Sequence, residues 1–324
     1  MKAVVWTAYG PPEVLEVRQV EEPIPGDHDI LVKVRASSVT AGDVELRRST
    51  SMGALVVPLR LFLGVFRPRG TRIPGQELAG DVVAVGSEVT DFQVGDRVCG
   101  HSGFRFGGNA EYATLPQSGM VARIPDGVSY EEATTLPTAG LYGLYFSRQA
   151  DIRPGQTVLV NGGAGSIGSY AIQMALAAGA RVTAVDRGDK GEFLTDLGVD
   201  EVIDYRTRDF ATNVDVYDAI LDVIDKSSFP VAATSLKPGG IYLHSDISPL
   251  AALRRRLFRA SGGRRSEFVA GREDADDLEY LLAKVSAGEI RSVIDHTFRL
   301  DDIVEAHRYA ESGDKRGHVV VTVA

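Results

Sequence analysis

A glycine-rich turn between an apolar strand pattern and an apolar helix pattern is the stretch whose residue types point most directly to chemistry. The turn fits G-x-G-x-x-G at Gly163, Gly165 and Gly168, after the apolar run Val158–Val160. Such glycines allow a tight turn, a close backbone approach to a pyrophosphate, and close packing of helix on strand. The N–H groups that open the helix attract phosphate. Residues 157–186 therefore predict a dinucleotide site.

An acidic residue follows at the spacing expected for a nicotinamide dinucleotide. Asp186 comes 18 residues after Gly168, where a carboxylate can accept a hydrogen bond from the adenosine ribose. A carboxylate there repels a 2′-phosphate and favours NAD(H). Arg187 and Lys190 follow at once and could accommodate that phosphate. We therefore lean slightly to NAD(H) and keep NADP(H) open.

Composition and charge bound the class of protein. The 324 residues suffice for two domains with cores, and the formal net charge of −9 disfavours nucleic acid and anionic membranes, apart from a local basic patch. Pro58, Arg60 and Gly64 interrupt the longest apolar run, so no transmembrane helix is expected. The N-terminus lacks a signal-peptide pattern. The single cysteine, Cys99, excludes a disulfide framework and is expected to be a small buried residue. We expect a cytoplasmic, enzyme-like protein.

The periodicity of the chain changes near residue 125. The preceding residues are rich in strands and turns, which predicts a β-barrel-like domain. From Ser129 onward, strands alternate with helix-length segments, which predicts a parallel, doubly wound sheet. Ser129 and Glu132 fit a capping box that opens a helix reaching the Leu136 region. The expected strands cover residues 3–6, 15–20, 30–36, 78–85, 97–99, 158–160, 181–185, 201–203, 217–223, 240–243 and 318–323.

Phrases along the whole chain resemble the medium-chain dehydrogenase/reductase superfamily. They include MKAVVWTAYGPPEVLEV, PGQELAGDVVAVGSEVTDFQVGDRVCG and IRPGQTVLVNGGAGSIG. The chain is most similar to the zinc-free branch of quinone oxidoreductases and enoyl reductases. The resemblance implies an α/β fold: a GroES-like β-barrel domain from residues 1–125 and 290–324, and a Rossmann doubly wound parallel sheet from residues 126–289. It also implies a cleft where the domains meet and a homodimer formed through the edge of the cofactor sheet.

The resemblance further implies where zinc would bind. The zinc-dependent relatives use a cysteine, a histidine beside a glutamate, and a second cysteine, and the matching positions here are Thr40, Gln76 beside Glu77, and Thr138. Zinc needs thiolate, imidazole or carboxylate, so Glu77 alone cannot hold it, and no metal is expected. Without a Lewis acid, the simplest chemistry is hydride transfer from NAD(P)H to a carbon that is already electrophilic, as in a quinone or an α,β-unsaturated carbonyl.

Four side chains are weighed as candidates for catalysis. Thr40 lies where many zinc-free relatives have an asparagine; its hydroxyl could donate to a substrate carbonyl or bond to its own backbone. Tyr142 could give a proton to an enolate or pack as a core tyrosine. His244 ends the strand 240–243, where such sheets place ligand, and His101 lies in a loop expected to border the cleft. Either histidine could instead serve as a hydrogen-bonding loop residue.

Further residues complete the expected site. We expect further cofactor contacts from two groups of residues. Within the turn they are Ala164, Ser166 and Ile167, and beyond it they are Tyr205, Val223, His244 and Ser245. The basic run 253–265 could recruit an acidic group or form a solvated helix face. Residues 49–71 form an apolar and basic stretch expected over the substrate pocket. The substrate is expected to be a small molecule.

Other functions on this fold stay open. One is a redox-neutral or cyclising enzyme of specialised metabolism, since fold does not fix function. Another is a cofactor-binding regulatory protein without turnover. A zinc-free alcohol dehydrogenase is a third.

Overall fold

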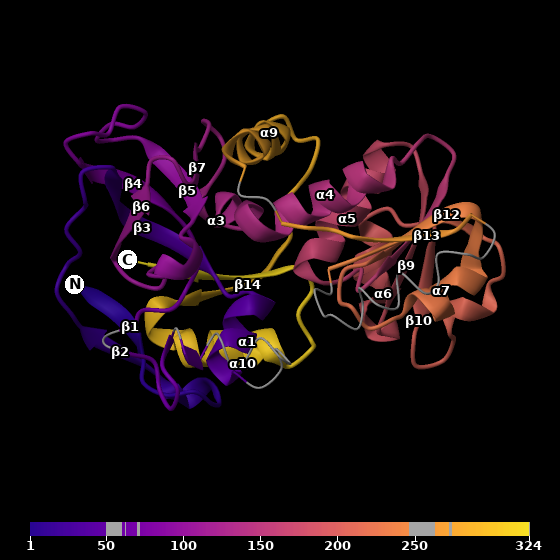
Figure 1. Ribbon diagram of the computed structural model, residues 1–324, viewed down its shortest axis with the longest axis horizontal. Coiled ribbons are helices and arrows are strands. Elements are labelled where there is room, and N and C mark those ends of the chain that lie inside the picture. The colour runs from indigo at the N-terminus through magenta and orange to yellow at the C-terminus, as the bar shows by residue number, and fades with distance from the viewer. Residues whose placement is uncertain (50–59, 62, 70–71, 246–262, 272–273, 324) are drawn as a thin grey trace. The chain divides into compact units, whose positions relative to one another are not determined.

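The chain divides into two compact units in the computed structural model, which describes residues 1–49, 60–61, 63–69, 72–245, 263–271 and 274–323. The first unit comprises residues 1–138 and 273–324, and the second comprises residues 139–272 (Figure 1). The domain limits expected from the sequence, after residues 125 and 289, remain predictions. No helix within the described ranges is long and apolar enough to cross a bilayer.

The second unit is built on a parallel sheet of six strands in the order β10-β9-β8-β11-β12-β13. In chain order this is 3-2-1-4-5-6, the doubly wound arrangement that binds dinucleotides where the order reverses, here between β8 and β11. The central strands are apolar on both faces because the sheet is covered on both sides. The strands are β8 (Thr157–Asn161), β9 (Arg181–Asp186), β10 (Glu201–Asp204), β11 (Tyr217–Asp222), β12 (Leu236–His244) and β13 (Arg265–Phe268).

Helices precede and connect these strands. Helix α4 packs against α5, and a Cβ at Gly143 of α4 would lie 2.7 Å from Tyr170 of α5, so a small residue sets their separation. The helices are α4 (Leu141–Ala150), α5 (Ser166–Ala177), α6 (Gly191–Asp196) and α7 (Phe229–Ser235), with short 3₁₀ turns at Gly188–Lys190 and Phe210–Thr212.

The first unit contains a largely antiparallel sheet in the order β14-β15-β3-β4-β5-β7, with β6 also paired to β3, and a separate pair β1-β2. Among the described strand pairs of this sheet, only β14 and β15 run parallel. The strands are β1 (Lys2–Trp6), β2 (Leu15–Gln19), β3 (Asp29–Ser38), β4 (Glu77–Val85), β5 (Arg97–His101), β6 (Tyr112–Pro116), β7 (Met120–Arg123), β14 (Ile294–Arg299) and β15 (His318–Thr322).

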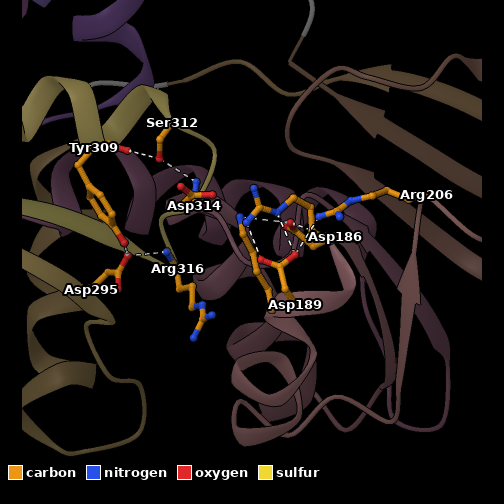
Figure 2. Close-up of polar contacts among 10 residues, drawn as sticks. Asp186, Asp189, Arg206, Asp295, Tyr309, Ser312, Asp314 and Arg316 are labelled. Atoms are coloured by element: carbon orange, nitrogen blue, oxygen red, sulfur yellow. Dashed lines mark hydrogen bonds and ion pairs between the residues drawn. The ribbon is translucent and has the colours of Figure 1, made fainter.

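The helices of the first unit join distant parts of the chain. Helix α10 lies beside α1 (Figure 1), and the buried Arg47 of α1 pairs with Glu311 of α10. Tyr309 of α10 donates a hydrogen bond to Asp295 of β14 at 2.6 Å (Figure 2). The helices are α1 (Ala41–Arg48), α3 (Tyr130–Ala133), α9 (Ala275–Ser286) and α10 (Ile303–Glu311), with 3₁₀ turns at Pro12–Val14, Gly103–Arg105 and Leu300–Asp302.

The capping box at the start of α3 is confirmed. Ser129 Oγ accepts a hydrogen bond from the Glu132 N–H at 3.1 Å, and Glu132 accepts in return from the Ser129 N–H at 2.9 Å. The expected continuous helix is shorter than predicted, because α3 ends at Ala133 and a π-helical turn occupies Leu136–Gly140. Pro137 lacks the N–H that an α-helix would use here.

Candidate functional site

The glycine-rich turn leads from β8 into α5 of the second unit. Helix α5 has Gly165 at its N-cap, and no side chain caps it. A Cβ at Gly168 would lie 2.2 Å from the carbonyl oxygen of Gly162, so only glycine lets the helix approach the turn this closely. A Cβ at Gly165 would meet only that same oxygen, at 3.3 Å. Gly165 therefore has room for a ligand beside its backbone, as a phosphate-binding helix N-terminus requires.

Two glycines before the helix shape the turn itself. Gly162 has φ +88°, and a Cβ there would also lie 2.5 Å from Ile224. A Cβ at Gly163 would lie 2.9 Å from the methyl group of Ala184 in β9. The sequence reading identified Gly163 and missed Gly162. The Gly-Gly pair at the strand end was the available signal, because such pairs mark turns that need left-handed backbone.

The carboxylate of Asp186 faces the turn. It accepts hydrogen bonds from the N–H groups of Ala164 at 3.0 Å and Arg187 at 2.8 Å, and Lys190 pairs with it at 3.3 Å. The Arg187 side chain pairs with Asp189. Arg206 also contacts Asp189, at 2.9 Å (Figure 2). The structure thus brings together the acid and the two cations that the sequence singled out, and adds Asp189 and Arg206.

A pocket of about 780 Å³ opens beside this turn, where β8, β9 and β11 end. Tyr205, expected at the adenosine end of the cofactor, lines it. The hydroxyl of Ser227, another lining residue, is buried and makes no hydrogen bond within the described part of the chain. Sequence reasoning missed most of the lining, which consists of Asn161, Val185, Tyr205, Arg208, Asp209, Phe210, Ile224, Lys226, Ser227, Ser228 and Val231.

The fully buried Asp222 fixes the ends of three strands at this edge. Its carboxylate accepts from Asn161 of β8 at 2.8 Å, from Tyr242 of β12 at 2.7 Å, and from the Ser227 N–H at 2.8 Å. Buried carboxylates are tolerated when donors surround them in this way. Val223, the next residue, is buried and donates its N–H to the Asn161 carbonyl at 3.2 Å.

His244 ends β12 among aromatic rings. Its ring stacks on Tyr242 with centroids 5.7 Å apart and meets the edge of Phe268 at 6.2 Å. Ser245 donates both its N–H and its hydroxyl to Asp225, at 2.9 and 2.8 Å. Burial raises the pKa of Asp225 above its ordinary value, and the Ser245 hydrogen bonds oppose that shift.

Tyr142 lies near the start of α4 in the same unit. Its phenol oxygen lies against the backbone of Gly271, where an added Cβ would be only 2.6 Å away. Burial raises the pKa of Tyr142, the Gly271 backbone hydrogen bond opposes this, and the charge of Asp225 adds to it. The phenol is therefore protonated at neutral pH, as a proton donor must be.

Thr40, in the first unit, is the N-cap of α1. Its hydroxyl accepts from the Asp43 N–H at 3.1 Å and donates to the Asp43 carboxylate at 2.6 Å. Burial raises the pKa of Asp43, whereas the Thr40 hydrogen bonds lower it. The local role that the sequence left open for Thr40 is thus present, and its proposed contact with substrate remains a prediction.

The other two positions that match zinc ligands in relatives, Gln76 and Thr138, also make hydrogen bonds within the first unit. The Gln76 amide donates to the Gly103 carbonyl at 3.0 Å. The Thr138 N–H donates to the buried Glu77 carboxylate at 2.6 Å, and Ser38 donates to its other oxygen. Burial raises the pKa of Glu77 to about 7, and the nearby charge of Asp43 adds to this. No group of three His, Cys, Asp or Glu suited to a metal occurs among the described residues.

Two further residues that the sequence singled out, Cys99 and His101, can be placed in the first unit. Cys99 is fully buried, as expected, and burial raises the pKa of its thiol. His101 Nδ1 accepts a hydrogen bond from the Gly103 N–H at 3.0 Å.

Most of the basic run 253–265 lies outside the described residues; Arg264 within it pairs with Asp215, and Arg265 pairs with Glu267. Of residues 49–71, those from 50 to 59 and residues 62, 70 and 71 also lie outside the described residues.

The residues present fit a nicotinamide dinucleotide. Gly165 leaves the phosphate approach open, Asp186 faces the turn, and the pocket with its unbonded Ser227 hydroxyl adjoins them. These features match a pyrophosphate, a ribose and an adenine in that order.

Comparisons with known proteins identify the family of the chain. Residues 26–126 match the family model "Alcohol dehydrogenase GroES-like domain", and residues 197–321 match "Zinc-binding dehydrogenase". A 2-methylene-furan-3-one reductase from Solanum lycopersicum is 30% identical over 335 residues, covering 99% of this chain and 79% of the relative. The chain belongs to the medium-chain dehydrogenase/reductase superfamily. A chloroplastic quinone oxidoreductase, QR1, from Triphysaria versicolor is 29% identical over 339 residues, covering 99% and 98%.

Solved structures extend the similarity to three dimensions. The quinone oxidoreductase from Coxiella burnetii has a TM-score of 0.88 and 28% identity, covering 100% of this chain and 99% of that one. The mycobacterial protein Rv1454c, solved in complex with NADPH, has a TM-score of 0.82 and 25% identity, covering 99% of each chain. The expected α/β fold, with a Rossmann sheet and a GroES-like domain, is confirmed. The protein is an enzyme of this superfamily, an NAD(P)H oxidoreductase that acts on a small molecule.

Two glycine variants should separate cofactor binding from folding. Gly165→Ala adds a methyl group on the ligand side, so we expect NADH binding to weaken by at least about tenfold with stability changed by less than about 1 kcal/mol. Gly168→Ala forces a methyl group against backbone, so we expect destabilisation of about 3 kcal/mol. Isothermal titration and chemical denaturation measure the two effects. Unchanged NADH affinity in Gly165→Ala would place the pyrophosphate elsewhere.

Glu77 should make the stability of the first unit depend on pH. Its pKa is about 7 in the folded protein against an ordinary 4.5, so the folded state binds more protons between these values. The free energy of unfolding should therefore fall as pH rises from about 4.5 to 7, by up to about 3 kcal/mol. Fluorescence of Trp6, the single tryptophan and a buried residue of this unit, can follow denaturation. The Glu77→Gln variant should lack this dependence on pH. If the free energy of unfolding changed with pH in the same way in the variant and the wild type, Glu77 would not be its cause.

Proposed function

We propose that this enzyme is a zinc-independent reductase that transfers hydride from NAD(P)H to a quinone or an α,β-unsaturated carbonyl. The observation that carries the proposal is the donor set at the positions matching zinc ligands in relatives. The Thr40 hydroxyl caps α1, the Gln76 amide bonds to Gly103, and Thr138 offers its backbone N–H. Neutral oxygens and amides of this kind are poor zinc ligands. The relatives named as quinone oxidoreductases and a furanone reductase support the substrate class.

The residues of the second unit would hold the cofactor in a defined orientation. The N–H groups at the start of α5, with Gly165, would bind the pyrophosphate, and Asp186 would accept from the adenosine ribose. When bound, the nicotinamide supplies the hydride. His244, Ser245 and Val223 lie at the strand ends and would border the nicotinamide side of the site.

Tyr142 is the best-placed proton donor within the second unit. Hydride addition to an enone or quinone leaves an oxyanion that must be neutralised or stabilised. The raised pKa of Tyr142 keeps its phenol protonated, and the Gly271 backbone fixes the position of its oxygen. Tyr142 would therefore donate a hydrogen bond or a proton to that oxyanion.

The surroundings of Asp186 favour NAD(H) slightly. The Asp186 carboxylate would repel a 2′-phosphate, and the nearby guanidinium groups of Arg187 and Arg206 already pair with Asp189. A 2′-phosphate would have to displace that pairing to use them. The ion pair with Lys190 offsets part of the Asp186 charge and so weakens the repulsion of a 2′-phosphate. NADP(H) therefore stays the second candidate cofactor. A homodimer through the edge of the cofactor sheet and a cytoplasmic location are proposals that follow from the family resemblance.

Metal-free protein tests the function. After exhaustive chelation, we expect the protein to oxidise NADH, and NADPH more slowly, with members of a panel of quinones and enones. These substrates are already electrophilic, so zinc is not needed to polarise them. Absorbance loss of the nicotinamide and product analysis measure the reaction. Activity that returns only with added zinc would contradict the proposal. Product formation without net nicotinamide consumption would instead favour the redox-neutral alternative.

Tyr142→Phe tests the proton donor. We expect kcat to fall by at least about tenfold while NADH binding changes little, since the ring is retained and only the hydroxyl is lost. Tyr145→Phe removes a hydroxyl from the same helix and is the matched control. Steady-state kinetics with one enone measures both variants. Equal kcat in Tyr142→Phe and the wild type would remove Tyr142 from catalysis.

A further inference from the structure

A strongly basic segment stands out in an acidic chain. From Leu46 to Gln76 the sequence contains six arginines and no Asp, Glu or Lys, whereas the whole chain carries a net charge of −9. Arg47 is buried and paired with Glu311, so it does not contribute to the surface. The other five lie at positions 48, 60, 67, 69 and 72.

The described residues 64–69 of this segment form a loop fixed by backbone contacts. Gly64 has φ +131°, and a Cβ there would lie 2.0 Å from the Arg67 carbonyl oxygen. The Arg69 N–H donates to the Leu63 carbonyl at 2.8 Å, and the Tyr9 hydroxyl donates to the Gly64 carbonyl at 2.7 Å. The loop, hereafter the arginine loop, is thus fastened to the body of the first unit at its base.

A polar pocket of about 530 Å³ lies under the arginine loop. Three of its lining residues are arginines: Arg18 from β2, and Arg67 and Arg69 from the loop. Arg18 pairs with Glu16, whereas Arg67 and Arg69 have no carboxylate partner among the described residues. The complete lining is Val5, Trp6, Thr7, Arg18, Arg67, Pro68 and Arg69. A pocket lined by three arginines, one of which is paired with a carboxylate, suits a phosphate-sized anion.

Large apolar side chains are exposed beside that pocket. Phe66 is 91% exposed, Leu61 59% and Val65 41%, all within a few residues of Arg67 and Arg69. A phenylalanine this exposed gains nothing from the fold, because burial is what stabilises it. Exposed apolar residues beside basic ones occur where proteins lie on membrane interfaces, with the ring in the acyl boundary and the cations at the headgroups.

We propose that the arginine loop docks the protein on an anionic lipid bilayer, with Phe66 inserted among the acyl chains and a headgroup phosphate held by Arg18, Arg67 and Arg69. Charge complementarity selects this occupant. The segment from Leu46 to Gln76 has six arginines and no acidic residue in a chain of net charge −9, so an anionic surface attracts this segment and repels the acidic parts of the chain. Docking of this kind is peripheral and requires no spanning helix. The proposal stands independently of the reductase function.

Sedimentation with vesicles tests the docking. We expect the full chain to co-sediment with phosphatidylcholine vesicles that contain phosphatidylserine, much less with pure phosphatidylcholine, and less in high salt. Emission of Trp6, which lines the pocket and is the single tryptophan, should shift on binding. Phe66→Ser and the double variant Arg67→Gln with Arg69→Gln should each reduce partitioning by about tenfold.

A matched control exists on the same unit. Ile24 is 90% exposed but lies between Glu22 and Asp27, so Ile24→Ser should leave vesicle binding unchanged. Circular dichroism checks that each variant is folded. If the double arginine variant does not fold, Phe66→Ser alone still tests the proposal. Equal binding to neutral vesicles, or no effect of Phe66→Ser, would overturn the proposal. So would a Trp6 response to inorganic phosphate without any vesicle binding, which would mark the pocket as a site for a free anion.

Discussion

The close approach of helix α5 to the turn after β8 is the constraint on which the second unit depends. At Gly168 an added Cβ would meet the Gly162 carbonyl oxygen at 2.2 Å, so any side chain there would push the helix away. The approach brings an uncapped helix N-terminus to the point where the strand order reverses. The same turn contacts Asp186 through the Ala164 N–H. Sheet packing and the proposed phosphate and ribose contacts therefore share one short segment.

Two buried carboxylates stabilise the surroundings in different ways. Asp222 accepts hydrogen bonds from three elements at the strand ends of the second unit, so its charge is distributed over fixed donors. Glu77 in the first unit accepts from Ser38 and Thr138, which is too few donors to offset burial, and its pKa rises. The first carboxylate links strand ends at the edge of the sheet where the cofactor is proposed to bind. The second should make the stability of its own unit depend on pH.

Sequence patterns predicted much of the fold, because apolar periodicity is local. The strand cores, the glycine turn and the Ser129 capping box all follow from neighbouring residues. Strands β6, β7, β13 and β14 were not predicted; β14 is a half-exposed edge strand whose apolar pattern is weak. The donors around Asp222 and the pocket lining also escaped prediction, because they come from segments far apart in the chain. Thr40 shows a further limit, since a cap and a substrate donor have the same sequence signature.

The reaction proposed for this enzyme is direct hydride transfer from the nicotinamide to carbon or a quinone. The decisive measurement uses NADH deuterated on one face at C4, an enone substrate and metal-free protein, with mass analysis of the product. We expect one deuterium in the reduced product from one cofactor face and none from the other, because Gly165, Asp186 and the adjoining pocket would hold the dinucleotide in a single orientation. Product that carries no deuterium from either face would contradict it.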